Sequence, residues 1–309
     1  PEEPEEPPVP EPEEPYVRVI DPSKPMVALT FDDGPHDTWS NAILDVLEEN
    51  HALATFFEVG RNVRAHPEPV QRMAELGCEV ASHSNAHKDL SKLKKKTLIK
   101  DLDTADAAFT DAGVEPPALV RPPYGAVNKN VKSATGRSIV TWTVDTEDWR
   151  SRDAQAVIDY VQNYGDLDGE IVLMHSIYES TADAVRVLVP WLQEQGYQLV
   201  TVTELLAYYY GELPQPDRFY GYTYFSGHGR TDTPVPLPGE TVPGAGVPAE
   251  EETPDTPAAL ADEPEAPAES ESPAEEAPAE TDKEWKPVRV PDTVDLAPAS
   301  IPNPALFMP

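Results

Sequence analysis

Short apolar segments of strand type alternate with segments of helical period through the middle of this chain, and no other feature constrains the fold as strongly. The strand segments are residues 27–31, 55–59, 79–82, 119–121, 139–144, 171–174 and 198–200. Apolar residues spaced three or four apart mark the helices between them, as with Ile43, Leu44 and Leu47. Glycines stand where helices of this kind usually end: Gly77, Gly113 and Gly196.

This alternation predicts an α/β fold with parallel strands, because helical crossovers join strands that run in the same direction. Seven strands over about 190 residues favour a short, irregular (β/α) barrel over an open sheet, although periodicity alone does not separate the two. In both architectures the functional residues gather at the carboxyl ends of the strands.

Two acidic, proline-rich flanks enclose this body. Of the 36 prolines, 7 lie in residues 1–15 and 17 in residues 226–309, and the whole chain carries a formal net charge of -33. Such segments offer little apolar surface to bury, and their like charges repel one another. We therefore predict an acidic linker at 1–17, the globular domain at 18–213, an aromatic extension at 214–225 that covers the edge of the body, and a disordered tail at 226–309.

The first flank is expected to act as a stiff spacer. The sequence starts without Met or a signal peptide, which we interpret as a mature fragment whose membrane anchor lies outside it. The alternative is a natural acidic N-terminus on a cytosolic protein. At the other end, Trp285 and residues 306–308 could form a docking motif or belong to a disordered end.

Composition also excludes several classes of protein. An acidic surface lacks the basic patch that binds phosphate backbones, so nucleic-acid binding is not expected. No apolar run approaches the ~20 residues that span a bilayer. Cys78 is the only cysteine, which excludes an internal disulfide framework and a cysteine-only metal site.

Two adjacent carboxylates, Asp32 and Asp33, follow the first strand in a turn that ends at Pro35. Adjacent carboxylates repel each other, so a buried pair needs a cation or a shared proton. A polar turn before a helix is the alternative. After the third strand, His83 and His87 are four residues apart and share one face if the segment is helical. With Asp33 they make two imidazoles and one carboxylate, a set typical of catalytic metal sites.

Three further strand ends carry polar residues. Arg121 begins a rigid Pro-Pro turn that contains Tyr124, and it could clamp a carboxylate or lie on the surface. The fifth strand ends in residues 145–149, which form either a solvated loop or a polar shell beside a stacking tryptophan. His175 ends the sixth strand, where a histidine without a catalytic role is common. A barrel would bring all five motifs to one rim.

Together these motifs resemble the polysaccharide deacetylase family, the carbohydrate esterases that share the NodB homology domain. The resemblance covers about residues 18–210, and the motifs occur in the family's order: 30–35, 83–87, 121–125, 145–149 and 173–175. It implies a distorted (β/α) barrel, one divalent metal ion, and hydrolysis of an N-acetyl amide or an O-acetyl ester on a sugar.

The resemblance also implies roles for individual residues. By the resemblance, the metal ligands would be Asp33, His83 and His87. Asp32 would be the general base, oriented by Arg121, and His175 would be the general acid, tuned by Asp148. The Tyr124 N–H would stabilise the oxyanion, and Trp149 and Leu173 would line the acetyl pocket. Ser82 and Asn85 depart from the family's usual residues at the edge of the groove, which leaves the fit of the substrate open.

The resulting hypothesis is a metal-dependent N-deacetylase that acts on the GlcNAc residues of a polysaccharide, peptidoglycan in the first place, as an extracellular or cell-wall monomer. Zinc suits the three ligands best, with cobalt, nickel and manganese as alternatives. An O-acetyl xylan esterase is the alternative within the enzyme class. A carbohydrate-binding pseudoenzyme should lack a ligand, the base or the acid, and this chain has all of them.

Overall fold

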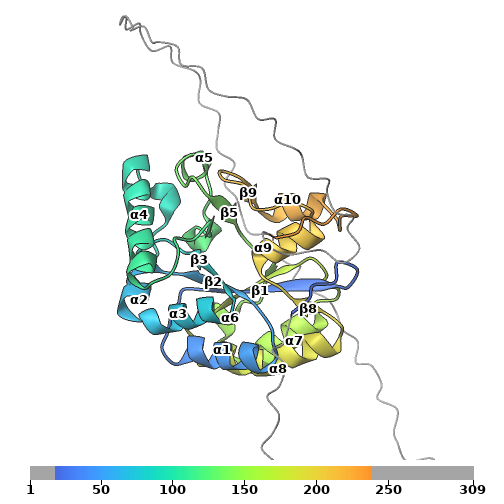
Figure 1. The fold of residues 1–309 in the computed structure, drawn as a ribbon. Coiled ribbons are helices and arrows are strands. Elements are labelled where there is room, and N and C mark those ends of the chain that lie inside the picture. The colour runs from blue at the N-terminus through green and yellow to red at the C-terminus, as the bar shows by residue number, and fades with distance from the viewer. Residues whose placement is uncertain (1–17, 238–309) are drawn as a thin grey trace, which may run out of the picture. The chain divides into compact units, whose positions relative to one another are not determined.

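The computed structural model describes residues 18–237, and its strands form one curved sheet in which every paired neighbour is parallel (Figure 1). The strands are β1 (Met26–Asp32), β2 (Thr55–Glu58), β3 (Glu79–Ser82), β4 (Leu119–Val120), β5 (Ser138–Val140), β6 (Val144–Asp145), β7 (Ile171–His175), β8 (Gln198–Leu199) and β9 (Phe219–Tyr220). Their order is β6-β7-β1-β2-β3-β4-β5-β9, and β8 pairs with β1. The distorted barrel expected from the sequence is confirmed, and each of the seven predicted segments contributes a strand.

One predicted segment, 139–144, is divided, and this division is the main distortion of the barrel. It becomes β5 and β6, which lie near opposite ends of the strand order. The Thr141 N–H donates to the Tyr220 carbonyl beside β5, whereas the Thr143 N–H donates to the Ile171 carbonyl beside β7, each over 3.0 Å. A straight strand cannot pair with both neighbours at once, so residues 141–143 carry the chain across the opening of the barrel.

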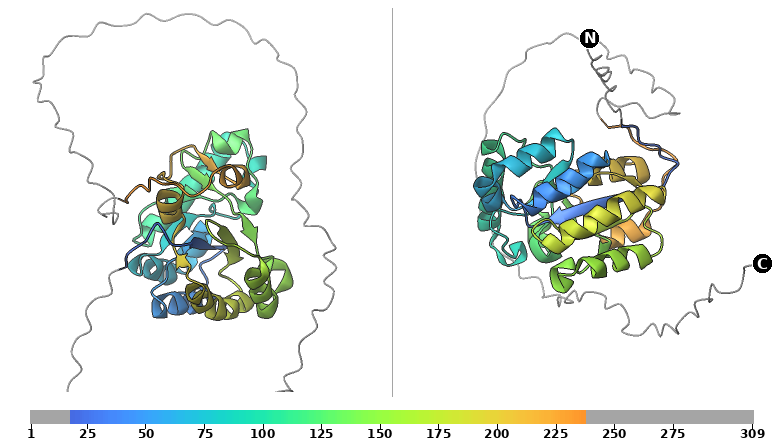
Figure 2. Two further views of the ribbon diagram at one scale, coloured as in Figure 1. Left: turned by 90° about the vertical axis from the view of Figure 1, so that its right-hand side faces the viewer. Right: turned by 90° about the horizontal axis from the view of Figure 1, so that it is seen from below.

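Helices surround the sheet (Figures 1 and 2). The α-helices are α1 (Trp39–Glu49), α2 (Gly60–Ala65), α3 (Pro67–Glu75), α4 (Lys95–Asp111), α5 (Lys129–Lys132), α6 (Asp148–Ser151), α7 (Ala154–Asn163), α8 (Glu179–Glu194), α9 (Val202–Glu204) and α10 (Tyr222–Gly227). Shorter turns are η1 (Leu90–Lys92), η2 (Pro123–Gly125) and the π-helical η3 (Leu205–Tyr209). The glycines predicted to end helices, Gly77, Gly113 and Gly196, all have positive φ, which a side chain would strain.

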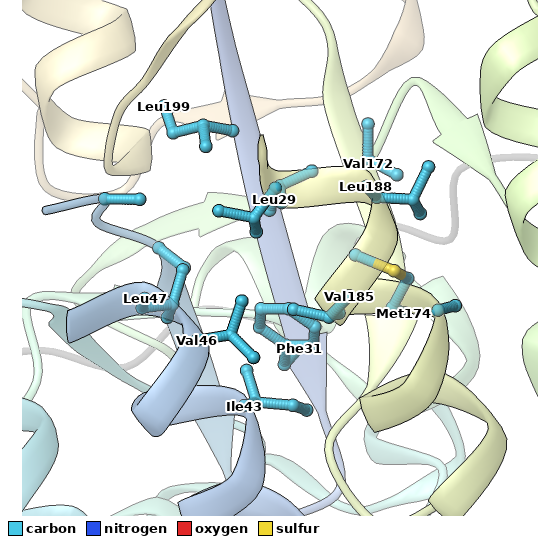
Figure 3. Close-up of a cluster of buried hydrophobic side chains, with 14 of the residues drawn as sticks. Leu29, Phe31, Ile43, Val46, Leu47, Val172, Met174, Val185, Leu188 and Leu199 are labelled. Atoms are coloured by element: carbon cyan, nitrogen blue, oxygen red, sulfur yellow. The ribbon is translucent and has the colours of Figure 1, made fainter. Parts of the chain in front are cut away.

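Strand β1 is buried along its whole length and separates two apolar layers. Its residues alternate between faces, as strand geometry requires. Leu29 and Phe31 pack against α1 and α8, which lie side by side across the strand (Figures 2 and 3). Met26 and Ala28 pack into the interior of the curved sheet. By the same alternation Thr30 and Asp32 face the interior, which brings a carboxylate to the rim of the barrel.

The segment that contains the aromatic residues 219–225 lies at the edge of the sheet. Strand β9 pairs with β5, and Tyr220 is fully buried. Residues 226–237, the described part of the predicted tail, contact this domain. Arg230 binds the Asp168 carboxylate, and the Val235 N–H donates to the Ala207 carbonyl.

Within residues 18–237, no helix combines the length and apolar character needed to cross a bilayer. The predictions for the acidic linker, for most of the tail, for Trp285 and for residues 306–308 lie outside the described residues.

Candidate functional site

The carboxylates that follow β1 lie at the centre of the rim. Asp32 is 3% exposed and ends the strand on its interior face. Asp33 turns the chain with a φ of 74°, a left-handed conformation that costs a non-glycine residue free energy. This turn separates the two neighbouring side chains, so that each has its own set of partners.

His83 and His87 reach Asp33 through a loop, and the helix considered for this segment does not form. Ser84 and His87 both have positive φ, and the Ser84 hydroxyl accepts a hydrogen bond from the His87 N–H over 3.0 Å. The loop folds back on itself because of these two left-handed residues. Both rings thereby face the Asp33 carboxylate without sharing a helical face.

Asp33, His83 and His87 form a cluster whose potential ligand atoms all lie within 4.8 Å of one another. Asp33 Oδ1 is 3.0 Å from His87 Nε2 and 3.5 Å from His83 Nε2. It is buried, yet none of its contacts has the geometry of a hydrogen bond. Lone pairs that converge on one point without bonding to each other fit a cation, and two imidazoles with one carboxylate suit a divalent metal ion.

The protonation states of the residues in the cluster favour binding of a metal ion. Burial opposes ionisation of Asp33, but the contact with His87 and the charges of the histidines outweigh it and lower its pKa to about 2. Burial lowers the pKa of His83, which favours the neutral ring. The His83 Nδ1 lies 2.6 Å from the Arg121 carbonyl, so an Nδ1–H tautomer donates there and leaves Nε2 free to bind metal.

Arg121 is fully buried behind Asp32. One of its terminal nitrogens donates to Asp32 Oδ1 over 2.7 Å and to the Thr30 hydroxyl over 2.9 Å. Its guanidinium carbon lies 3.9 Å from the centre of the Phe57 ring. The alternative that Arg121 lies on the surface is therefore wrong. Its buried guanidinium fixes one carboxylate oxygen of Asp32.

His175 and Asp148 form a second pair, in which Asp148 is fully buried and His175 is partly exposed. The His175 Nδ1 lies 2.8 Å from Asp148 Oδ1, and Asp148 also accepts hydrogen bonds from the Trp149 N–H and the Thr181 hydroxyl. Burial alone would lower the pKa of His175, but the hydrogen bond and the charge of Asp148 raise it overall. An Nδ1–H donated to Asp148 points Nε2 away from Asp148 and makes it available to donate a proton.

The remaining predicted residues differ in exposure. Tyr124 is 63% exposed, has a φ of 64° and places its ring edge-on to His87. Among residues 18–237, its backbone N–H has no acceptor. Trp149 is 47% exposed, whereas Leu173 is buried two residues before His175, on the same face of β7.

Backbone strain is concentrated at this rim. Eight non-glycine residues of the described chain have positive φ, and six of them lie in loops that follow the strands of the site. The six are Asp33, Ser84, His87, Tyr124, Glu147 and Arg152. Such conformations persist where surrounding contacts hold them, and they are common at functional sites.

One hollow borders the cluster, and a second hollow meets the first. The histidine hollow, of about 390 Å³, is lined by Asp33, His36, Arg61, Asn62, His66 and His87. The acidic hollow, of about 590 Å³, is lined by Arg152, Asp153, Tyr178, Glu179 and Asp183. Ile177 lines both, so the two hollows meet at this residue.

Sequence reasoning did not identify several residues of this region. Thr181 lies on α8 and supports Asp148, a contact that no local pattern indicates. Glu58 is fully buried beside β1, and burial together with the charges of Asp32 and Asp33 raises its pKa well above its usual value. Its carboxyl oxygens have no hydrogen-bond partner in the described residues.

The chain is similar to known proteins in sequence and in fold. The family model described as polysaccharide deacetylase matches residues 20–140. The chain is 41% identical over 192 residues to the peptidoglycan-N-acetylmuramic acid deacetylase PdaC of Bacillus subtilis. This match covers 62% of this chain and 41% of PdaC. It is 33% identical over 191 residues to a peptidoglycan-N-acetylglucosamine deacetylase of Bacillus cereus, covering 59% of this chain and 89% of that protein.

The solved structure of PdaC superimposes with a TM-score of 0.60 at 39% identity. That match covers 61% of this chain and 93% of the solved chain. The present chain thus spans less than half the length of full PdaC.

Proposed function

Because the chain belongs to the polysaccharide deacetylase family, we propose that it is a metal-dependent hydrolase that removes N-acetyl groups from the GlcNAc residues of peptidoglycan and releases acetate. The observation that carries this proposal is the convergence of Asp33, His83 and His87 within 4.8 Å, beside the Asp32–Arg121 and His175–Asp148 pairs. A protein that only bound carbohydrate would not need a base and an acid beside a potential metal site.

Asp33, His83 and His87 would hold the ion, and zinc suits these ligands best, with cobalt, nickel or manganese as alternatives. When bound, a divalent ion polarises the amide carbonyl and lowers the pKa of water to roughly 7. The carboxylate of Asp33 is committed to this role, because it is ionised and has no hydrogen bond of its own.

Asp32 would act as the general base. Arg121 holds its Oδ1, which leaves Oδ2 as the oxygen free to accept a proton from the attacking water. Oδ2 also lies 3.7 Å from His83 Nε2, so the base adjoins the cluster. The Tyr124 N–H, which has no acceptor among residues 18–237, would donate to the oxygen that becomes negative in the transition state.

His175 would protonate the departing amine. Its raised pKa keeps more of the ring in the acid form near neutral pH, which a general acid requires. The acetyl methyl group would lie against Trp149 and Leu173. Deacetylation of this kind would place the protein in the cell wall, with the polysaccharide as its partner.

The function is tested by acetate release from chito-oligosaccharide, intact peptidoglycan and acetylated xylan, each with and without a chelator. We expect chelator-sensitive release from the two N-acetylated substrates, with xylan the poorest. Release mainly from xylan would favour the O-acetyl esterase, and no release from any substrate in the presence of added zinc would favour the pseudoenzyme.

Replacing His87 with Ala is expected to weaken metal binding by more than about 100-fold, beyond the 10–100-fold that residues outside the coordination sphere typically contribute. The variant loses one of three ligands and leaves Asp33 without its nearest ring nitrogen. Metal content after dialysis, measured by elemental analysis, checks this. His228→Ala is the control, because His228 is exposed and lies outside the cluster. Unchanged metal content in His87→Ala would remove His87 from the ligand set.

Replacing Asp148 with Asn is expected to shift the basic limb of the kcat–pH profile to lower pH. The carboxylate raises the pKa of His175, so its loss lowers that pKa, and the protonated acid disappears at a lower pH. At pH 8 we expect kcat to fall about 10-fold or more, within the range for general acid catalysis. Asp159→Asn, an exposed change on α7, should leave the profile in place. An equal loss of kcat at every pH would contradict this role for Asp148.

A further inference from the structure

The arginines of residues 18–237 are nearly all occupied by partners within the protein. Eight of the eleven form ion pairs with carboxylates. Of the other three, Arg64 donates to Asn85 and to the Thr104 carbonyl, and Arg152 lies over the Tyr178 ring and donates to the Trp149 carbonyl. Arg61 alone has a side chain with no hydrogen bond, ion pair or ring contact among the described residues.

Arg61 lies at the candidate active site. It is exposed near the start of α2, and it lines the histidine hollow together with Asp33 and His87. Because α2 follows β2, which pairs with β1, Arg61 lies on the β2 side of Asp33. A sugar next to the one that loses its acetyl group would pass this side chain.

The two hollows differ in charge. Asp33 is the only acid that lines the histidine hollow, and its charge would be compensated by a bound metal ion. The acidic hollow has Asp153, Glu179 and Asp183 around Arg152. An anionic substituent is therefore repelled on the β7 side of Asp33 and attracted on the β2 side. In a chain with a net charge of -33, an unpaired arginine at this place is the attractive element for an anion.

We propose that Arg61 is a specificity-determining residue that binds a carboxylate on the sugar adjacent to the one deacetylated. This inference rests on the proposed function and extends it. The substrate class is a glycan in which N-acetylated sugars without a carboxylate alternate with sugars that carry a lactyl ether, as in peptidoglycan. The carboxylate is either that of the lactyl group or that of an attached peptide. The attacked sugar is then the one without a lactyl group, and its neighbour supplies the anion.

The test compares four soluble substrates: peptide-free glycan strands with free lactyl carboxylates, the same strands with those carboxylates amidated, peptide-bearing strands, and neutral chito-oligosaccharide. The readout is kcat/KM for acetate release at fixed ionic strength, expressed as the ratio between carboxylate-bearing and amidated strands. We expect Arg61→Gln to lower this ratio about fivefold, as befits a solvent-exposed charge pair. Arg61→Lys should retain most of it.

Lys96→Gln is the matched control, because it removes the same charge from an exposed position on α4 that lines neither hollow. Its ratio should equal that of the wild type, which separates a contact with Arg61 from the general effect of net charge. A loss of preference with peptide-free strands assigns the contact to the lactyl carboxylate, and a loss only with peptide-bearing strands assigns it to the peptide.

An Arg61→Gln ratio equal to that of the wild type on both kinds of strand overturns the inference. So does a product in which the lactyl-bearing sugar has lost its acetyl group. The first result leaves the proposed function intact, because that function stands if the wild type releases acetate from chito-oligosaccharide. The second result leaves N-deacetylation in place and changes only the sugar of peptidoglycan that is attacked. If the wild type releases none from any substrate, the proposed function fails. Calorimetric titration then decides the inference. It measures the dissociation constants of the wild type and of Arg61→Gln for carboxylate-bearing and for amidated strands, and the preference between the two kinds of strand is compared in the same way.

Discussion

Asp32→Asn is expected to lower kcat on chito-oligosaccharide by about 10²–10⁴-fold, the range typical of a lost general base. Asn has nearly the same shape, and its carbonyl oxygen can still accept the hydrogen bond that Arg121 donates over 2.7 Å. What the variant lacks is a second oxygen able to take a proton. The barrier should therefore rise without a change in the fold of the rim.

Metal content separates this role from that of a ligand. Asp32 Oδ2 lies 3.7 Å from His83 Nε2, but Asp32 is not part of the cluster of mutually close ligand atoms. The variant should therefore bind as much metal as the wild type by elemental analysis. Asp103→Asn, an exposed change on α4, is the control for an unspecific effect of removing one carboxylate. Turnover near the wild-type rate would exclude Asp32 as the base, and a parallel loss of metal would make it a ligand.

The sequence could indicate that these residues lie close together because they stand at the carboxyl ends of parallel strands. Asp33 directly follows β1, His83 directly follows β3, and His175 ends β7, and parallel strands bring their carboxyl ends to one rim. Alternation along β1 then places Asp32 on the interior face. This reasoning needs only strand positions and the period of two, both of which can be read from the sequence.

Features that depend on contacts between distant segments were not predictable in this way. The division of 139–144 into two strands follows from hydrogen bonds of Thr141 and Thr143 to residues far away in the chain. The loop from His83 to His87 has a spacing compatible with a helix, and only two left-handed residues show otherwise. Thr181 has no motif of its own, because its role comes entirely from its contact with Asp148.

Arg61 shows a different limit. An exposed arginine early in a helix is unremarkable in sequence, and its meaning depends on what it does not contact. Ion pairs, hydrogen bonds and a ring contact occupy the other arginines of residues 18–237, whereas Arg61 borders the histidine hollow. The absence of a side-chain partner for Arg61 among residues 18–237 can be recognised only from the structure.

Arg121→Leu is expected to destabilise the fold by about 3–5 kcal/mol, the usual cost of breaking a buried ion pair from one side. The change removes the cation from a fully buried position and leaves the Asp32 carboxylate beside Asp33 with its charge uncompensated by arginine. Chemical denaturation followed by circular dichroism, with metal removed by chelator, measures the free energy of unfolding without stabilisation by bound ion.

The double variant Arg121→Leu with Asp32→Asn identifies the origin of that cost. If the orphaned charge dominates, removing it should restore much of the stability, so the double variant is more stable than Arg121→Leu alone. If lost packing against Phe57 and lost hydrogen bonds to the Val140 and Thr141 carbonyls dominate, the double variant stays as unstable as the single one. We expect the first result, because the shortest contact of the guanidinium is the one it makes with Asp32. A destabilisation below about 1 kcal/mol for Arg121→Leu would instead place this pair in the range of surface ion pairs and contradict its role in holding the base.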